Sequence, residues 1–92
     1  MTAIKIHPDD NVATLINDAE GESKVTIISS NGDTVRRVQV TNSLQLAHKL
    51  AIEKIEKNTD VIKYGEVIGR ATQSIEAGDH VHVHNVVSLR VK

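Results

Sequence analysis

The chain has 92 residues, of which 39% are hydrophobic, and a formal net charge of -1. This length is enough for one small domain spanning residues 1–92. It contains no cysteine, which excludes disulfides, thiolate metal sites and a cysteine nucleophile. Tyr64 is the only aromatic residue and no basic stripe is present, which argues against nucleic-acid binding. No apolar run approaches the ~20 residues that span a membrane. We therefore expect a cytoplasmic protein whose thin aliphatic core is supported by a partner chain or by homo-oligomerisation.

Short strands are predicted along the first half of the chain. The turn-forming segment His7 to Asn11 separates two apolar runs. Farther on, Asn31-Gly32 lies between two runs rich in β-branched residues. This dipeptide is a strong hairpin signal, because both residues tolerate the positive φ of a type I′ turn. The predicted strands are 3–6, 12–16, 24–29 and 34–41, with a hairpin between the last two.

Residues 42–57 have two interpretations. Their apolar residues recur at helical spacing, and Asn42 or Ser43 would cap a helix. An internal repeat with a period of twenty residues argues against a helix in the second half, because residues 51–61 match residues 71–81. The shared frame is Ala-x-x-x-Ile-Glu-x-(Asn/Gly)-x-x-Val.

Asn58 and Gly78 occupy the same slot of this repeat, and both residue types adopt left-handed backbone readily. Each copy is therefore predicted to be a strand, a tight turn and a second strand. The fold class that follows is mainly β, with short strands, hairpins and at most one short helix.

The sharpest chemical feature is the segment Asp79-His80-Val81-His82-Val83-His84-Asn85. In a strand, its three histidines would share one face, with neighbouring imidazoles ~7 Å apart. Two imidazoles at that spacing can converge on one ion, whereas a third along a straight strand cannot. An imidazole also exchanges protons near neutral pH. The alternative is a solvated strand face without a function.

Several segments resemble the altronate/galactarate dehydratase family, in its small N-terminal SAF-type module of β-clip fold. The resemblance runs from about His48 to Val86 and extends more weakly to the opening strand. Asn58 departs from it, because the family usually has glycine there. The module also exists as a free-standing subunit, including the α subunit of sulfolactate sulfo-lyase. This chain ends seven residues after Asn85, so it resembles the free-standing form. The segments that carry the resemblance are His48-Lys49, Ala51-x-x-x-Ile55, Val61 to Gly69, Ala71-Thr72-Gln73 and His80 to Asn85.

The resemblance implies a SAF-type β-clip domain that acts as the small subunit of a two-subunit hydro-lyase. The implied reaction is β-elimination from a 2-hydroxy acid with a divalent metal, iron(II) or manganese(II), held mainly by a large catalytic subunit. The implied catalytic residues are His82, His84, His80 and His48, and the implied metal ligands are His82 and His84. The candidate substrate-binding residues are Lys49, Tyr64, Gly65 and Asn85. A lysine can hold the charge of a carboxylate, and Tyr64 places a phenol beside a glycine that permits close approach.

Two other functions stay open at this point. The chain would equally serve as a sulfolactate sulfo-lyase α subunit, because that enzyme shares the module. A non-catalytic β-clip domain that binds a sugar acid or assembles a complex is the alternative from another class. In that case, His48-Lys49 would be a surface pair and Tyr64 an aromatic residue at the edge of the core.

Overall fold

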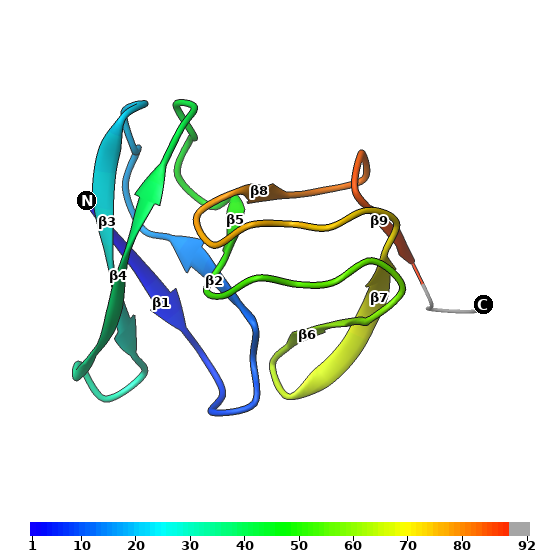
Figure 1. Ribbon diagram of the computed structural model, residues 1–92. Coiled ribbons are helices and arrows are strands. Elements are labelled where there is room, and N and C mark those ends of the chain that lie inside the picture. Colours follow the sequence, from blue (N-terminus) through cyan, green and yellow to red (C-terminus); the bar gives the residue numbers. More distant parts are fainter. Residues whose placement is uncertain (89–92) are drawn as a thin grey trace.

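The computed structural model describes residues 1–88, which form short β-strands with no helix among them (Figure 1). No helix that is long and apolar enough to cross a bilayer occurs in these residues. The mainly β prediction is confirmed, and the undecided segment 42–57 is not helical. In chain order the strands are β1 (Thr2–Lys5), β2 (Val12–Leu15), β3 (Ser23–Ser29), β4 (Thr34–Val40), β5 (Lys49–Ala51), β6 (Asp60–Lys63), β7 (Glu66–Ala71), β8 (His80–Val81) and β9 (Val86–Ser88).

The strands form two sheets, which lie side by side in Figure 1. The larger has the order β4-β3-β1-β2-β5-β8, and the smaller has the order β6-β7-β9. Successive side chains of a strand point to opposite faces, so β2 and β5 each contribute to two separate cores. In β5, for example, Leu50 joins the first core and Ala51 joins the second. The second core also contains Val61, Ile75 and Val81.

The predicted repeat is confirmed, and the structure adds two further copies of the same unit. In each copy a strand ends in a bend, a buried residue forms an isolated bridge, and a two-residue turn follows. The bridges join Ala19 to Leu44 and Ile55 to Ile75, each through two backbone hydrogen bonds of 2.8 Å. The last turn residue always has positive φ: Glu22 (65°), Ala47 (76°), Asn58 (72°) and Gly78 (90°).

The predicted hairpin is present as β3 and β4, but its predicted type I′ turn is wrong. Gly32 has a positive φ of 94°, whereas Asn31 does not. The loop is instead closed by hydrogen bonds from Gly32 N to Ser29 O (2.9 Å) and from Ser29 N to Asp33 O (2.7 Å). This is the three-residue loop that has one glycine in left-handed backbone. Two consecutive residues with positive φ occur instead at Tyr64 (57°) and Gly65 (74°), between β6 and β7.

Candidate active site at the histidine cluster

The structure brings together all four histidines that were predicted to be catalytic. His48 precedes β5 and His80 begins β8, and these two strands pair in antiparallel fashion. The Nδ1 atom of His48 lies 2.8 Å from Nε2 of His80, within hydrogen-bond distance. The ring centre of His80 lies 5.3 Å from that of His82 and 5.5 Å from that of His84. We call these four side chains the histidine cluster.

The alternation of side chains in the β5–β8 pair sets which residues face the cluster. Val81 points into the second core, and its partner Lys49 lies on the same face. His80 and its partner Leu50 lie on the opposite face. The strand geometry therefore separates Lys49 from the His80 side of the sheet.

The prediction that His80 to His84 form one straight strand is wrong. The strand β8 ends at Val81, and residues 82–85 form a turn. The buried side chain of Asn85 holds this turn: its Nδ2 donates to His80 O (2.8 Å), and its Oδ1 accepts from His82 N (3.0 Å). Because the chain turns back, the His84 ring reaches His80, which a straight strand would not allow.

Asn85 was predicted to bind substrate, but both polar groups of its amide are engaged by the backbone of the turn. Its contacts in the structure are those of a residue that positions the histidines. A substrate contact of Asn85 stays a prediction.

Replacement of Asn85 by alanine is expected to lower the free energy of unfolding by about 2–4 kcal/mol, because it leaves His80 O and His82 N without partners. Urea unfolding followed by circular dichroism measures this loss. Asn31→Ala, in the exposed β3–β4 loop, is the matched control and should cost under about 1 kcal/mol. Equal losses in the two variants would contradict the assigned role of Asn85.

The cluster contains histidines without acidic partners. Among residues 1–88, no ion pair joins any of the four histidines to a carboxylate. Partial burial lowers the pKa of His80, and the nearby His48, His82, His84 and Lys49 lower it further. Burial also lowers the pKa of Lys49, and the charge of Lys63 adds to the effect. The lowered pKa favours the neutral form of His80 at pH 7.

The lowered pKa of His80 makes stability depend on pH. Below the ordinary histidine pKa of about 6.5, the unfolded chain takes up a proton that folded His80 resists. The free energy of unfolding is therefore expected to be unaffected by His80 above that pH and to fall as the pH drops below it. Urea midpoints between pH 7.5 and pH 5 measure this slope. His80→Gln should flatten this slope, and an equally steep slope in that variant would contradict the assignment.

The cluster by itself does not have the arrangement of a complete metal site. Residues 1–88 contain no group of three or more histidine, aspartate or glutamate side chains placed to hold a metal ion. His48 and His80 bond to each other, and the rings of His80 and His82 stack with an angle of 10° between their planes. A divalent metal bound here would take most of its ligands from another chain. Coordination by His82 and His84 stays a prediction.

Three grooves of different chemistry meet at the cluster. A polar groove of about 230 Å³ is lined by Asn42, Gln73, Ser74, Asp79, His80, His84 and Asn85. A wider groove of about 550 Å³ runs past His48 and His80 and is bordered by Asp18 and Glu20. The third groove, of about 220 Å³, is mostly apolar and is lined by Lys49, Ile68, Val81, His82, Val83, Val86 and Ser88.

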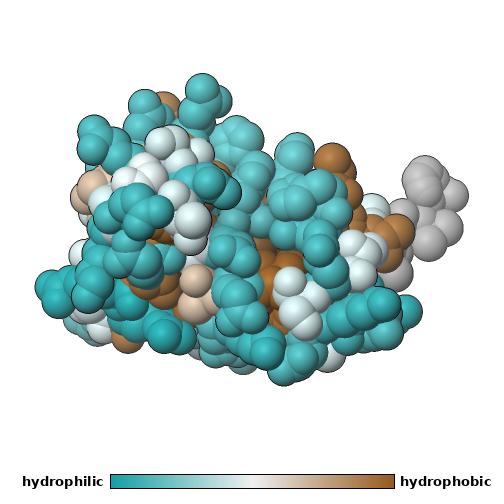
Figure 2. Space-filling model, turned by 45° about the horizontal axis from the view of Figure 1, so that its top comes forward, coloured by the Kyte–Doolittle hydropathy of each residue, from teal (hydrophilic) through white to brown (hydrophobic). Residues whose placement is uncertain are grey.

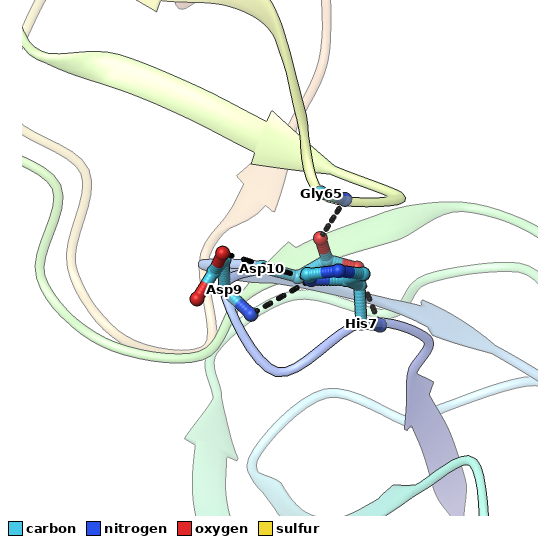
Figure 3. Close-up of polar contacts among 4 residues, drawn as sticks. All are labelled: His7, Asp9, Asp10 and Gly65. Carbon is cyan, nitrogen blue, oxygen red and sulfur yellow. Dashed lines mark hydrogen bonds and ion pairs between the residues drawn. The ribbon is translucent and has the colours of Figure 1, made fainter.

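Tyr64 and Gly65 were predicted to bind substrate, but the structure does not bring them to the cluster. They form the turn between β6 and β7 in the smaller sheet, whereas β8 is an edge strand of the larger sheet (Figure 1). The buried carboxylate of Asp10 accepts hydrogen bonds from Gly65 N (2.8 Å) and His7 N (3.1 Å), as Figure 3 shows. A Cβ atom at Gly65 would lie 2.9 Å from the His7 ring. Gly65 therefore allows the segment 7–10 to pack on this turn.

Asp10 is the residue of this region that sequence reasoning missed. The sequence indicates only that it belongs to the turn-forming segment His7 to Asn11. Its side chain is 4% exposed, and it ties the opening segment to a turn 55 residues away. Such a long-range partner gives no local pattern.

Comparison with known proteins yields a family and several relatives. Residues 1–89 match the family described as the altronate/galactarate dehydratase SAF domain. The chain is 45% identical over 86 residues to altronate dehydratase of Escherichia coli K12, covering 92% of this chain and 16% of that protein. It is 34% identical over 82 residues to altronate dehydratase of Bacillus subtilis, covering 89% of this chain and 15% of that protein.

A third relative is similar to this chain in length. The (2R)-sulfolactate sulfo-lyase subunit alpha of Chromohalobacter salexigens is 37% identical over 83 residues, covering 89% of this chain and 88% of that subunit. The chain thus spans only 15–16% of the two altronate dehydratases but most of the sulfo-lyase subunit. The match and the helix-free architecture confirm the SAF-type β-clip fold expected from the resemblance. The chain belongs to the altronate/galactarate dehydratase SAF domain family.

Proposed function

We propose that this protein is the small subunit of a two-subunit lyase of the dehydratase type, which removes water from a 2-hydroxy sugar acid. The observation that carries the proposal is the histidine cluster, in which β5, β8 and the Asn85 turn gather four imidazoles on one surface. The grooves around the cluster are open, so a large subunit would complete the site. Relatives named as dehydratases and as a lyase subunit support this reaction class.

The proposed reaction is a β-elimination. A base removes the proton from the carbon next to the carboxylate, and hydroxide leaves from the neighbouring carbon with a proton from an acid. His82 and His84 are the more exposed pair, and we assign them to acid–base contact with the substrate. His80 and His48 lie behind them, and neutral His80 can accept a proton and share it with His48 across their 2.8 Å contact. A divalent metal, when bound mainly by the large subunit, would stabilise the negative charge of the intermediate.

The polar groove is the proposed position of the hydroxylated part of the substrate. Gln73 and Ser74 line it next to His80 and His84, and amide and hydroxyl groups can pair with substrate hydroxyls. An acid with several hydroxyls needs such partners, because unpaired polar groups are costly to bury. The groove therefore favours a polyhydroxylated acid.

Sulfolactate sulfo-lyase is the second candidate, because this chain covers 88% of the length of one such subunit alpha. The reaction has the same first step, but sulfite leaves in place of hydroxide. Purification of this chain together with a large dehydratase-like chain, followed by assays on altronate, galactarate and sulfolactate, tests both candidates. Release of sulfite would favour the sulfo-lyase, and a keto acid from altronate or galactarate would favour the dehydratase. An intact complex that converts none of the three would favour a non-catalytic binding or assembly module.

A further inference from the structure

The apolar groove beside the cluster has no role in the reaction proposed above. Its walls are Ile68, Val81, Val83 and Val86, with Lys49, His82 and Ser88 at its borders. Val83 is 80% exposed. Figure 2 shows hydrophobic surface at the right of the view, on the side where Figure 1 places β9. An apolar groove bordered by an exposed valine is suited to bind another apolar group.

A polyhydroxylated substrate is a poor occupant for this groove. Its hydroxyls would face valine and isoleucine side chains, and they would lose hydrogen bonds to water without replacement. The polar groove on the His80 and His84 side offers those partners instead. The two sides of the cluster therefore suit two different occupants.

The positive charge of Lys49, at the border of the groove, is a second feature that a bound group must match. Lys49 lies on the face of the β5–β8 pair that carries Val81, away from His80. Among residues 1–88, no ion pair joins Lys49 to a carboxylate. A half-buried lysine without an acidic partner is stabilised by an anion placed at the mouth of the groove. The suitable occupant is therefore an apolar side chain that has a carboxylate close by.

We propose that the apolar groove docks a segment of the large subunit that inserts an apolar side chain against Val83 and Val86 and pairs an aspartate or glutamate with Lys49. This inference rests on the proposed function, and it assigns Lys49 to the subunit interface in place of the predicted substrate contact. His82 borders both the groove and the cluster, so a chain docked here lies directly beside the histidines. In the altronate dehydratases, 84–85% of the chain lies outside the region matched here, which leaves ample chain to cover this surface.

Val83→Asp tests the groove, with association to the large subunit measured by isothermal titration calorimetry. We expect the Kd to rise at least about 30-fold, because an anchor side chain is lost and a charge faces an apolar partner. Val35→Asp, at a valine of β4 that is 40% exposed, is the matched control and should change the Kd less than about threefold. Circular dichroism checks that both variants fold. Equal affinities of Val83→Asp and Val35→Asp would overturn the proposal.

Lys49→Met tests the acidic partner, since it keeps the aliphatic stem and removes the charge. We expect weaker association and a smaller loss of affinity between 50 and 300 mM salt than in the parent chain. An unchanged Kd together with a raised KM would place the substrate at Lys49 and overturn its assignment to the interface. Sedimentation velocity of the small subunit alone tests whether a second copy of this chain occupies the groove. If the parent chain self-associated and Val83→Asp abolished that association, the choice of the large subunit as occupant would be overturned. If the parent chain and the large subunit did not associate at all, the proposed function would fail with this inference.

Discussion

Gly78→Ala is expected to leave the domain largely unfolded at 25 °C. Gly78 has a φ of 90°, and a Cβ atom there would lie 2.0 Å from the backbone oxygen of Gln39 and 3.0 Å from its carbonyl carbon. The obstacle is backbone of β4, and Gly78 itself is fixed by a 2.8 Å hydrogen bond from its N–H to Ala51 O. Neither the backbone of Gln39 nor that of Gly78 can move away without breaking hydrogen bonds. We expect a loss above about 5 kcal/mol, which is the whole stability of a small domain near the lower end of the usual range.

Circular dichroism and the dispersion of amide signals in an NMR spectrum would measure the loss of folded protein. Gly32→Ala is the matched control, because Gly32 has a similar φ of 94° but nothing within 4 Å of the added Cβ atom. That variant should lose only about 1–2 kcal/mol, the cost of left-handed backbone for alanine. If both variants unfolded alike, the contact with Gln39 would not be the cause.

His82→Ala and His84→Ala are each expected to lower the kcat of the two-subunit complex by at least about 100-fold, the usual contribution of a general acid or base. Both side chains are exposed, so neither replacement should reduce the stability of the domain by more than about 1 kcal/mol. Steady-state kinetics on the substrate identified by the assay panel measure the effect. His7→Ala is the control, since His7 packs on Gly65 outside the cluster and should leave kcat within about threefold.

Thermal unfolding of each variant and a binding measurement with the large subunit separate lost chemistry from lost assembly. Full activity of both His82→Ala and His84→Ala in an intact complex would remove the catalytic role of the histidine cluster. The non-catalytic binding or assembly module would then be the better description of this chain.

Local patterns were enough to predict most of the backbone. Alternating β-branched residues placed β3 and β4, and the match of 51–61 to 71–81 identified a repeated turn. The other two copies of that turn were missed because backbone hydrogen bonds define the unit. Its buried position holds Ala19 or Leu44 as readily as isoleucine, and its positive φ falls on Glu22 or Ala47 as well as on Asn58. A unit held by its backbone leaves a weak sequence pattern.

The cluster was predicted by residue type but not in shape. Alternation of histidine and valine has the period of a strand, and it looks the same whether the chain continues or turns after Val81. The side-chain amide of Asn85 makes the chain turn after Val81, because its two hydrogen bonds close the turn. For Tyr64 and Gly65, in contrast, the sequence did not predict the position in the fold. They were expected to bind substrate because a phenol lies beside a glycine that permits close approach, yet that glycine serves the packing of the turn on Asp10 and His7.

The paired turns also bear on how such a domain evolves. Two turns joined by main-chain hydrogen bonds hold together whatever exposed side chains they carry, so most of their surface is free to vary through mutation. Relatives that are at most 45% identical to this chain fit that expectation. A duplicated turn keeps the backbone hydrogen bonds that define its structure. One copy can then acquire functional side chains while the other copies maintain the fold. The histidines that follow the last turn, absent at the matching places after its sister copy, are what such a history would leave behind.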